Sequence, residues 1–214
     1  IIHDEIGRGE GANFVVARRC RARLADPSPR SLLSIFRSLL VTETGTYWTF
    51  AFGDGKRHVL GATPERHVSL RAGAVMMNPI SGTFRKHATR GMDEQVPEFL
   101  RFLEDEKEVF ELFMVTDEEL KIMCEICDRG GAVVGPLLKE MSRLIHTEYV
   151  LLGDSSWPTV DILRQSMFAP TVTGSPVVSA FRVIQRYEKE SRGYYGATIA
   201  LAEIGRASCR ERVS

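Results

Sequence analysis

The sequence predicts an α+β fold, in which antiparallel strands come before most of the helices. Strand-like segments between residues 47 and 78 are separated by turns of two or three residues, which is typical of antiparallel hairpins. Helical patterns dominate after Gly91, with neither internal repeats nor a regular strand–helix alternation. A chain of 214 residues can bury roughly 70% of its unfolded surface, which is enough for one large core.

The N-terminal half is expected to contain most of the strands. Residues 13–23 have a strand-like pattern, and Pro27 and Pro29 interrupt the chain after them. An amphipathic helix capped by serine is predicted over 31–40. Further strands are expected at 47–52, 57–62, 66–70 and 75–78, with turns at 53–55 and 71–73. The strand 75–78 is expected to end in Asn78-Pro-Ile-Ser-Gly-Thr83, which presents backbone amides and hydroxyls.

The C-terminal half is expected to be mainly helical. One long acidic helical stretch is predicted from Gly91 to about Cys127. A strand, two helices and a last strand follow, near 143–152, 158–167, 176–189 and 194–202. Because Cys124 and Cys127 fall within the helical pattern without a second cysteine pair, we interpret them as part of a buried helix face.

The composition argues against several classes of partner. The chain has 28 basic and 28 acidic residues, so we expect neither nucleic acid nor an anionic membrane as a partner. No apolar stretch reaches the length of about 18 residues that a membrane-spanning helix needs. Four cysteines do not make a disulfide framework, which favours a reducing compartment such as the cytoplasm.

Several acidic side chains and one histidine are candidates for chemistry. Glu65 lies in a predicted turn between two strands, and His146 lies in an otherwise apolar strand. Glu104, Glu108 and Glu111 are spaced to share one side of a helix. These glutamates can form a solvated face with ion pairs to Lys107 or can hold a divalent cation such as Mg²⁺, which prefers oxygen ligands. A lone histidine in such a strand is more often a core residue with its hydrogen bonds satisfied.

The order and spacing of six motifs resemble those of the chorismate-utilising enzymes. This family includes anthranilate synthase component I and the aminodeoxychorismate, isochorismate and salicylate synthases. Within it, the sequence looks most like the 2-amino-2-deoxyisochorismate synthases of phenazine biosynthesis. The resemblance covers most of residues 5–202 and implies an incomplete chorismate-binding fold, with antiparallel sheets and helices packed outside them. The motifs are GATPER (61–66), NPISGT (78–83), KEVFE (107–111), HT (146–147), FAPTVTGSP (168–176) and RGYY (192–195).

The resemblance also implies roles for individual residues. Glu65 matches the general acid, which would protonate the C4 hydroxyl of chorismate as it leaves. Glu111 matches a Mg²⁺ ligand, and Glu108 matches an acidic residue between metal and substrate. His146 is assigned with Glu65 and Glu108 to the catalytic group. The implied substrate-binding residues are Gly82, Thr83, Thr171, Gly174 and Tyr195.

The reaction is narrowed by one departure from the family pattern. Relatives that add water, or that make 4-amino-4-deoxychorismate, carry a lysine on the early strand that aligns with residues 13–16. Here no lysine precedes Lys56. Ammonia needs no base once it is delivered neutral, so we expect conversion of chorismate to 2-amino-2-deoxyisochorismate. The alternatives are an anthranilate synthase, which also eliminates pyruvate, and a non-catalytic α+β binding domain. The implied partners are chorismate, Mg²⁺, and ammonia from a glutamine amidotransferase domain or subunit.

The end of the chain departs from the family altogether. We expect residues 1–202 to be a partial synthase domain and residues 203–214 to be a non-native read-through tail. The 214-residue chain is expected to be inactive alone, because the family places further metal ligands and a substrate arginine beyond this point. Detectable chorismate turnover would contradict that expectation. The oligomeric state stays open, a homodimer of the full-length protein being one alternative.

Overall fold

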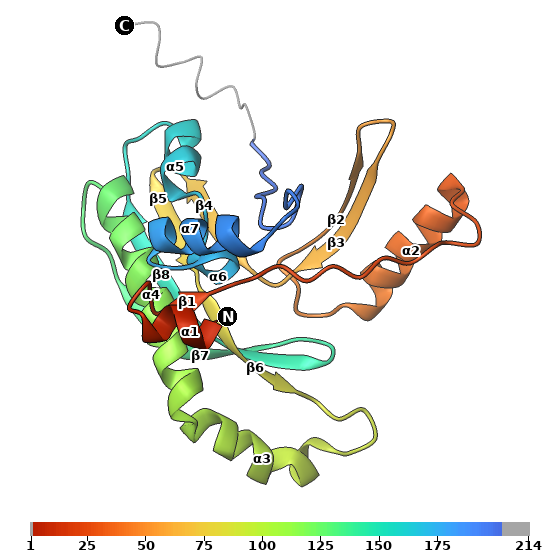
Figure 1. The fold of residues 1–214 in the computed structure, drawn as a ribbon, viewed down its shortest axis with the longest axis horizontal. Helices are drawn as coiled ribbons and strands as arrows, with labels where there is room; N and C mark the ends of the chain where they lie inside the picture. Colours follow the sequence, from red (N-terminus) through yellow and green to blue (C-terminus); the bar gives the residue numbers. More distant parts are fainter. Residues whose placement is uncertain (1, 203–214) are drawn as a thin grey trace, which may run out of the picture.

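The computed structural model describes residues 2–202, which form antiparallel sheets with helices packed against them (Figure 1). The predicted α+β class is therefore confirmed. The helices are α1 (Ile2–Gly7), α2 (Pro29–Thr42), α3 (Met92–Glu104), α4 (Glu106–Ile126), α5 (Thr159–Ser166), α6 (Pro170–Thr173) and α7 (Val177–Tyr187). The strands are β1 (Asn13–Phe14), β2 (Trp48–Gly53), β3 (His58–Thr63), β4 (Arg66–Arg71), β5 (Ala74–Asn78), β6 (Ile80–Arg85), β7 (Val133–Glu140), β8 (Leu144–Asp154) and β9 (Gly174–Ser175).

The largest sheet is organised around β8, the longest of its strands. β5 and β6 pair with the two halves of β8, while β7 pairs along its other edge and β4 extends the sheet beyond β5. All of these pairings are antiparallel. β2 and β3 form a separate hairpin, against which α2 packs, and β1 pairs with β9. Figure 1 shows the β2–β3 hairpin and α2 extending away from the large sheet.

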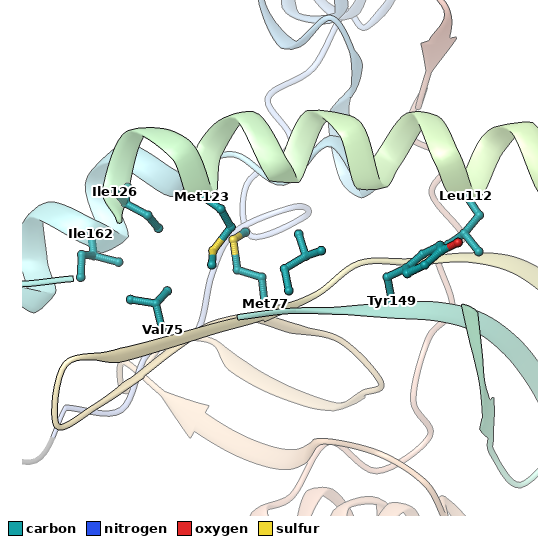
Figure 2. Packing of buried hydrophobic residues seen from close by; sticks show 8 residues of the cluster. Val75, Met77, Leu112, Met123, Ile126, Tyr149 and Ile162 are labelled. Carbon is teal, nitrogen blue, oxygen red and sulfur yellow. The ribbon is translucent and has the colours of Figure 1, made fainter. Parts of the chain in front are cut away.

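The main core lies between α4 and the large sheet. Figure 2 shows side chains of α4 and α5 meeting those of β5 and β8. Met77, Ile126 and Leu151 are almost inaccessible to solvent in this layer. A smaller cluster joins β1 to α7 through Phe14, Ala180 and Val183. These two clusters hold α4 and β1 on either side of the candidate site described below.

Local sequence signals explain where several elements begin. Ser28 caps α2 by accepting a hydrogen bond from the Ser31 amide, and Pro29 occupies the first turn, where its missing N–H costs nothing. Asp105 caps α4 by accepting from the Lys107 and Glu108 amides. Because Asp105 itself is extended, the single helix predicted from Gly91 to Cys127 is wrong, and two helices meet there.

Other predictions of secondary structure were wrong in informative ways. The strand predicted over 13–23 is limited to β1, since only Asn13 and Phe14 find a partner, in β9. The segment after Asn78 is itself a strand, β6, rather than the end of one, because β8 is long enough to pair with it as well. β7 was not predicted. The last strand expected near 194–202 is absent from the described residues, where residues 193–196 form a turn.

Two further predictions can be compared with the structure. Cys124 is exposed and Cys127 lies just after the end of α4, so a buried cysteine face is wrong. Among residues 2–202, no helix is long and apolar enough to cross a membrane. The tail predicted over residues 203–214 lies outside the described residues.

Candidate active site

Glu65 lies where the chain turns between β3 and β4, as predicted, and its side chain faces α6. The Thr171 hydroxyl donates a hydrogen bond of 2.9 Å to Glu65 Oε1. Burial raises the pKa of the Glu65 carboxyl to about 7, although the Thr171 hydrogen bond acts in the opposite direction. A carboxyl with such a pKa is half protonated near neutral pH, which suits a general acid.

A cavity of about 380 Å³ adjoins this pair. Thr171 lines the cavity from α6, and Glu111 lines it from α4. Thr171, which is bonded to Glu65, therefore lines the same cavity as Glu111. Glu65 itself is not among the residues that line this cavity, and its hydrogen bond with Thr171 is what connects it to the cavity wall. The rest of the lining consists of Asn13, Phe14, Val15, Val16, Ile80, Ser81 and Val115.

Ser81 is a site residue that the motifs did not single out. It lines the cavity, yet its hydroxyl is buried and has no hydrogen-bond partner among the described residues. Buried hydroxyls almost always have a partner, and a ligand can supply it. The signal in the sequence was present, since Ser81 stands within the Asn78–Thr83 motif.

Gly82, Thr83, His146 and Glu108 form a second group, beside this cavity. Thr83 and His146 are paired residues of β6 and β8, and His146 Nδ1 lies 3.1 Å from both Thr83 Oγ1 and the Gly82 carbonyl oxygen. Glu108 approaches from α4, so closely that a Cβ added to Gly82 would lie 2.9 Å from Glu108 Oε2. His146 is buried with its Nδ1 bonded, which fits a positioning role and a core role equally well.

Glu108 and Glu111 converge on one cation, the Lys107 ammonium. Lys107 Nζ lies 2.8 Å from an oxygen of each carboxylate, and these contacts, Glu108 first, hold the pKa of Lys107 above its ordinary value. Glu104 does not share this face, because it ends α3 before the break at Asp105. The ion pairs predicted for a solvated helix face are therefore present, on a face whose Glu111 also lines the cavity.

This carboxylate pair fits part of a Mg²⁺ site. One oxygen of Glu108 and one oxygen of Glu111 each lie 2.8 Å from the Lys107 ammonium. Mg²⁺ commonly takes one or two carboxylates as ligands while keeping several waters. Within residues 2–202, however, no group of three or more histidine, cysteine, aspartate or glutamate side chains could hold a metal ion. The remaining ligands would have to be water or substrate oxygens.

Gly174 and Tyr195 are placed differently from each other. Gly174 pairs with Phe14 at the wall of the cavity and has a φ of +117°, and a side chain there would collide with the Asn13 carbonyl oxygen. Tyr195 is half exposed, lies in a turn and contacts the Arg192 guanidinium through its ring, 5.2 Å from the centroid. Tyr195 is not among the residues that line the cavity.

Arg192 is a further residue that motif matching did not assign. Its guanidinium donates to the carbonyl oxygens of Val15 and Val172, at 2.5 and 2.8 Å, and pairs with the Glu188 carboxylate. Val15 lines the cavity and Val172 follows Thr171. Arg192 therefore ties together two walls that are far apart in the sequence.

A larger cavity of about 660 Å³ lies elsewhere, at the loop between β6 and α3. It contains none of the residues predicted to form the site. The smaller cavity is the better candidate because the predicted glutamate and threonine converge there.

Known proteins resemble this chain in sequence and in fold. The sequence profile of the chorismate binding enzymes matches residues 1–208. The chain belongs to the chorismate binding enzyme family. Phenazine-specific anthranilate synthases from Pseudomonas chlororaphis and Pseudomonas fluorescens are 52% and 51% identical to this family member over 201 residues. In each case the match covers 94% of this chain and 31% of the relative, so the chain spans about a third of the length of these curated relatives.

Solved structures show the same family fold. Anthranilate synthase component I from Streptococcus pneumoniae superposes with a TM-score of 0.76 at 26% identity, over 91% of this chain and 42% of that one. An isochorismate synthase from Bacillus anthracis superposes with a TM-score of 0.74 at 20% identity, over 88% of this chain and 51% of that one. The family's antiparallel sheets and outer helices are thus present in this chain, as the resemblance implied.

One prediction concerns the hydrogen bond between Thr171 and Glu65. Replacing Thr171 by valine removes a donor to the charged form of Glu65, so the pKa of Glu65 should rise above its value of about 7. In the full-length enzyme, the alkaline limb of the profile of kcat/KM against pH should move to higher pH. Thr173→Val is a matched control, because Thr173 bonds the Ala169 carbonyl instead. An alkaline limb at an unchanged pH would show that Thr171 does not lower the pKa of Glu65.

Proposed function

We propose that the parent protein of this chain aminates chorismate with ammonia to form 2-amino-2-deoxyisochorismate, in phenazine biosynthesis. The observation that carries the proposal is the pairing of a glutamic acid of pKa about 7 with a threonine that lines the Glu111 cavity. Protonation by Glu65 would convert the C4 hydroxyl, a poor leaving group, into water. The names of the two Pseudomonas relatives support the phenazine branch.

The cavity wall supports ammonia as the nucleophile. The wall formed by residues 13–16 is an amide side chain followed by three apolar ones, and no lysine is among the described residues that line the cavity. Such a wall offers no base to deprotonate water and no amine to form an adduct. Neutral ammonia needs neither, so the reaction proceeds once ammonia is delivered and Glu65 holds its proton. A glutamine amidotransferase domain or subunit would supply the ammonia, and the enzyme would work in the cytoplasm.

Magnesium would be held by Glu111, with Glu108 at the boundary between metal and substrate. When bound, the cation would neutralise the ring carboxylate of chorismate and stabilise developing charge as a Lewis acid. Side chains of the protein would orient the substrate and hold the proton. The free Ser81 hydroxyl and the Thr83–His146 pair would orient the anionic substrate, while Glu65 and Thr171 would hold the proton that is transferred.

An anthranilate synthase is the second candidate, because both Pseudomonas relatives carry that name. It would use the same amination and then eliminate pyruvate to give an aromatic ring. The two candidates therefore differ in whether a proton acceptor acts on the aminated intermediate, and they share every residue assigned above.

Product analysis tests the proposal directly. The full-length enzyme, given chorismate, Mg²⁺ and ammonium, should accumulate a non-fluorescent amine without releasing pyruvate. Anthranilate fluorescence together with stoichiometric pyruvate would establish the second candidate instead. Omitting Mg²⁺ should abolish the reaction in either case. No consumption of chorismate by the full-length protein under these conditions would support a non-catalytic binding domain.

A further inference from the structure

A second glutamate, Glu119, is buried in the core near the Glu65 site. It occupies the stripe of α4 that faces the sheet, between Thr116 and Met123, and it is 0% exposed. Both of its carboxylate oxygens are buried and lack a hydrogen-bond partner among the described residues. An acidic side chain in this state is unusual, because burial strongly disfavours an unpaired charge.

Helical spacing relates Glu119 to the cavity. Glu111, Val115 and Glu119 follow one another at intervals of four residues, which places them along one side of α4. Glu111 and Val115 line the cavity, so Glu119 comes one turn beyond them. On the opposite wall, Thr171 joins the cavity to Glu65, and α6 packs against α4. Glu65 and Glu119 therefore approach the same space from two different elements.

The electrostatics agree with this placement. Burial is the main cause that raises the pKa of Glu119 well above its ordinary value, and the charge of Glu65 is the second. The negative charge of Glu65 therefore adds to the effect of burial in disfavouring ionisation of Glu119. Two carboxylates in one desolvated space seldom ionise together.

We propose that Glu119 is the second carboxyl of the Glu65 site, a positioning residue that stays protonated and acts through Glu65. The pair then carries one negative charge at most. When Glu65 has given its proton to the leaving hydroxyl, its charge has a neutral O–H group as a neighbour rather than a second anion. The assignment of Glu65 as the acid rests on the proposed function, whereas the coupling of the two carboxyls does not.

Among the described residues, neither carboxylate oxygen of Glu119 has a hydrogen-bond partner, and no cation is among the causes that shift its pKa. α6 and β9 contain no titratable side chain, and α5 contributes Asp161 and Arg164, which pair with each other. From β8, His146 is bonded to Thr83 and Gly82, and Glu148 is a further acid. The remaining titratable groups on the strands nearby are Arg66, His67 and Arg71 of β4, Arg85 of β6, and Tyr149 and Asp154 of β8. The helix α3, which also packs against α4, carries Asp93, Glu94, Glu98, Arg101 and Glu104.

Titration of the carboxyls tests the pair without substrate, metal or turnover. In the 214-residue chain labelled with glutamate carrying ¹³C at the side-chain carboxyl, loss of one resonance in Glu119→Gln identifies Glu119. Its midpoint should lie well above the ordinary value for a glutamate side chain. In Glu65→Gln, the Glu119 midpoint should fall by about one pH unit or more, because a like charge has been removed. An unchanged Glu119 midpoint would overturn the proposal.

A second pair of variants separates coupling from packing. Glu119→Gln keeps a neutral polar group and should leave the Glu65 midpoint near its original value. Glu119→Leu removes that group, so the Glu65 midpoint should rise while the fold stays at least as stable. If the leucine variant folds with Glu65 unchanged, Glu119 is only a core residue and the inference fails. Failure of these titration tests would leave the amination proposal intact. An unexpected product in the assay of the full-length enzyme would leave the proposed pair of Glu65 and Glu119 intact.

Discussion

Replacing Glu65 by glutamine in the full-length enzyme is expected to lower kcat for chorismate amination by about 10²–10⁴-fold. Glutamine matches glutamic acid in size and keeps a hydrogen-bonding group for Thr171, but it cannot give a proton to the C4 hydroxyl. Steady-state kinetics with chorismate, Mg²⁺ and ammonium would measure the loss. KM should change much less than kcat, because the proton moves only in the transition state.

The pH dependence offers a second measurement of the same role. Since burial raises the pKa of Glu65 to about 7, the wild-type enzyme should lose activity as pH rises through that value and the acid becomes ionised. The residual activity of Glu65→Gln should lack this limb. Glu106→Gln is a suitable control, because Glu106 is exposed in the first turn of α4. Wild-type turnover by Glu65→Gln would remove Glu65 from the mechanism and favour a non-catalytic reading of the carboxylates.

Replacing Arg192 by methionine is expected to destabilise the chain by about 3–5 kcal/mol. The Arg192 and Glu188 side chains are only 15% and 10% exposed, so the substitution leaves a largely buried carboxylate without its cation. It also removes the donors to the Val15 and Val172 carbonyl oxygens. Chemical unfolding of the 214-residue chain near neutral pH would measure the change.

Two further variants make this result interpretable. Arg164→Met breaks a pair between exposed side chains on α5 and should cost less than about 1 kcal/mol. Glu188→Gln combined with Arg192→Met should recover part of the stability, because no uncompensated charge is left behind. A loss for Arg192→Met no greater than that for Arg164→Met would show that Arg192 does not hold the cavity walls together.

Local patterns predicted the elements whose causes are themselves local. The hairpins between residues 47 and 78 and the turn at Glu65 were foreseen, since glycine and proline specify such turns within a few residues. The position of β6 depends instead on β8, which starts some 60 residues later and is long enough to pair with both β5 and β6. The break at Asp105 was a local signal that was missed, because the acidic helical pattern continues across it.

Glu119 shows the limit of sequence patterns most clearly. In the sequence it is one of several acidic residues in Asp117-Glu118-Glu119, and nothing marks it as different. In the fold, Glu118 pairs with Lys121, whereas Glu119 is enclosed between α4 and the sheet. Only the rotation of α4 against β5 and β8 decides which of these carboxyls meets solvent.

By itself, the sequence determined the α+β class, the family and the chemical types available to the site, because motif order and residue identity are properties of the chain. The tertiary structure decided which of those residues meet. It placed Thr171 against Glu65, left the Ser81 hydroxyl without a partner, buried Glu119 and kept Tyr195 out of the cavity lining. The physical reason is that proximity and burial, which set the pKa of Glu65 and Glu119, arise from contacts between segments remote along the chain.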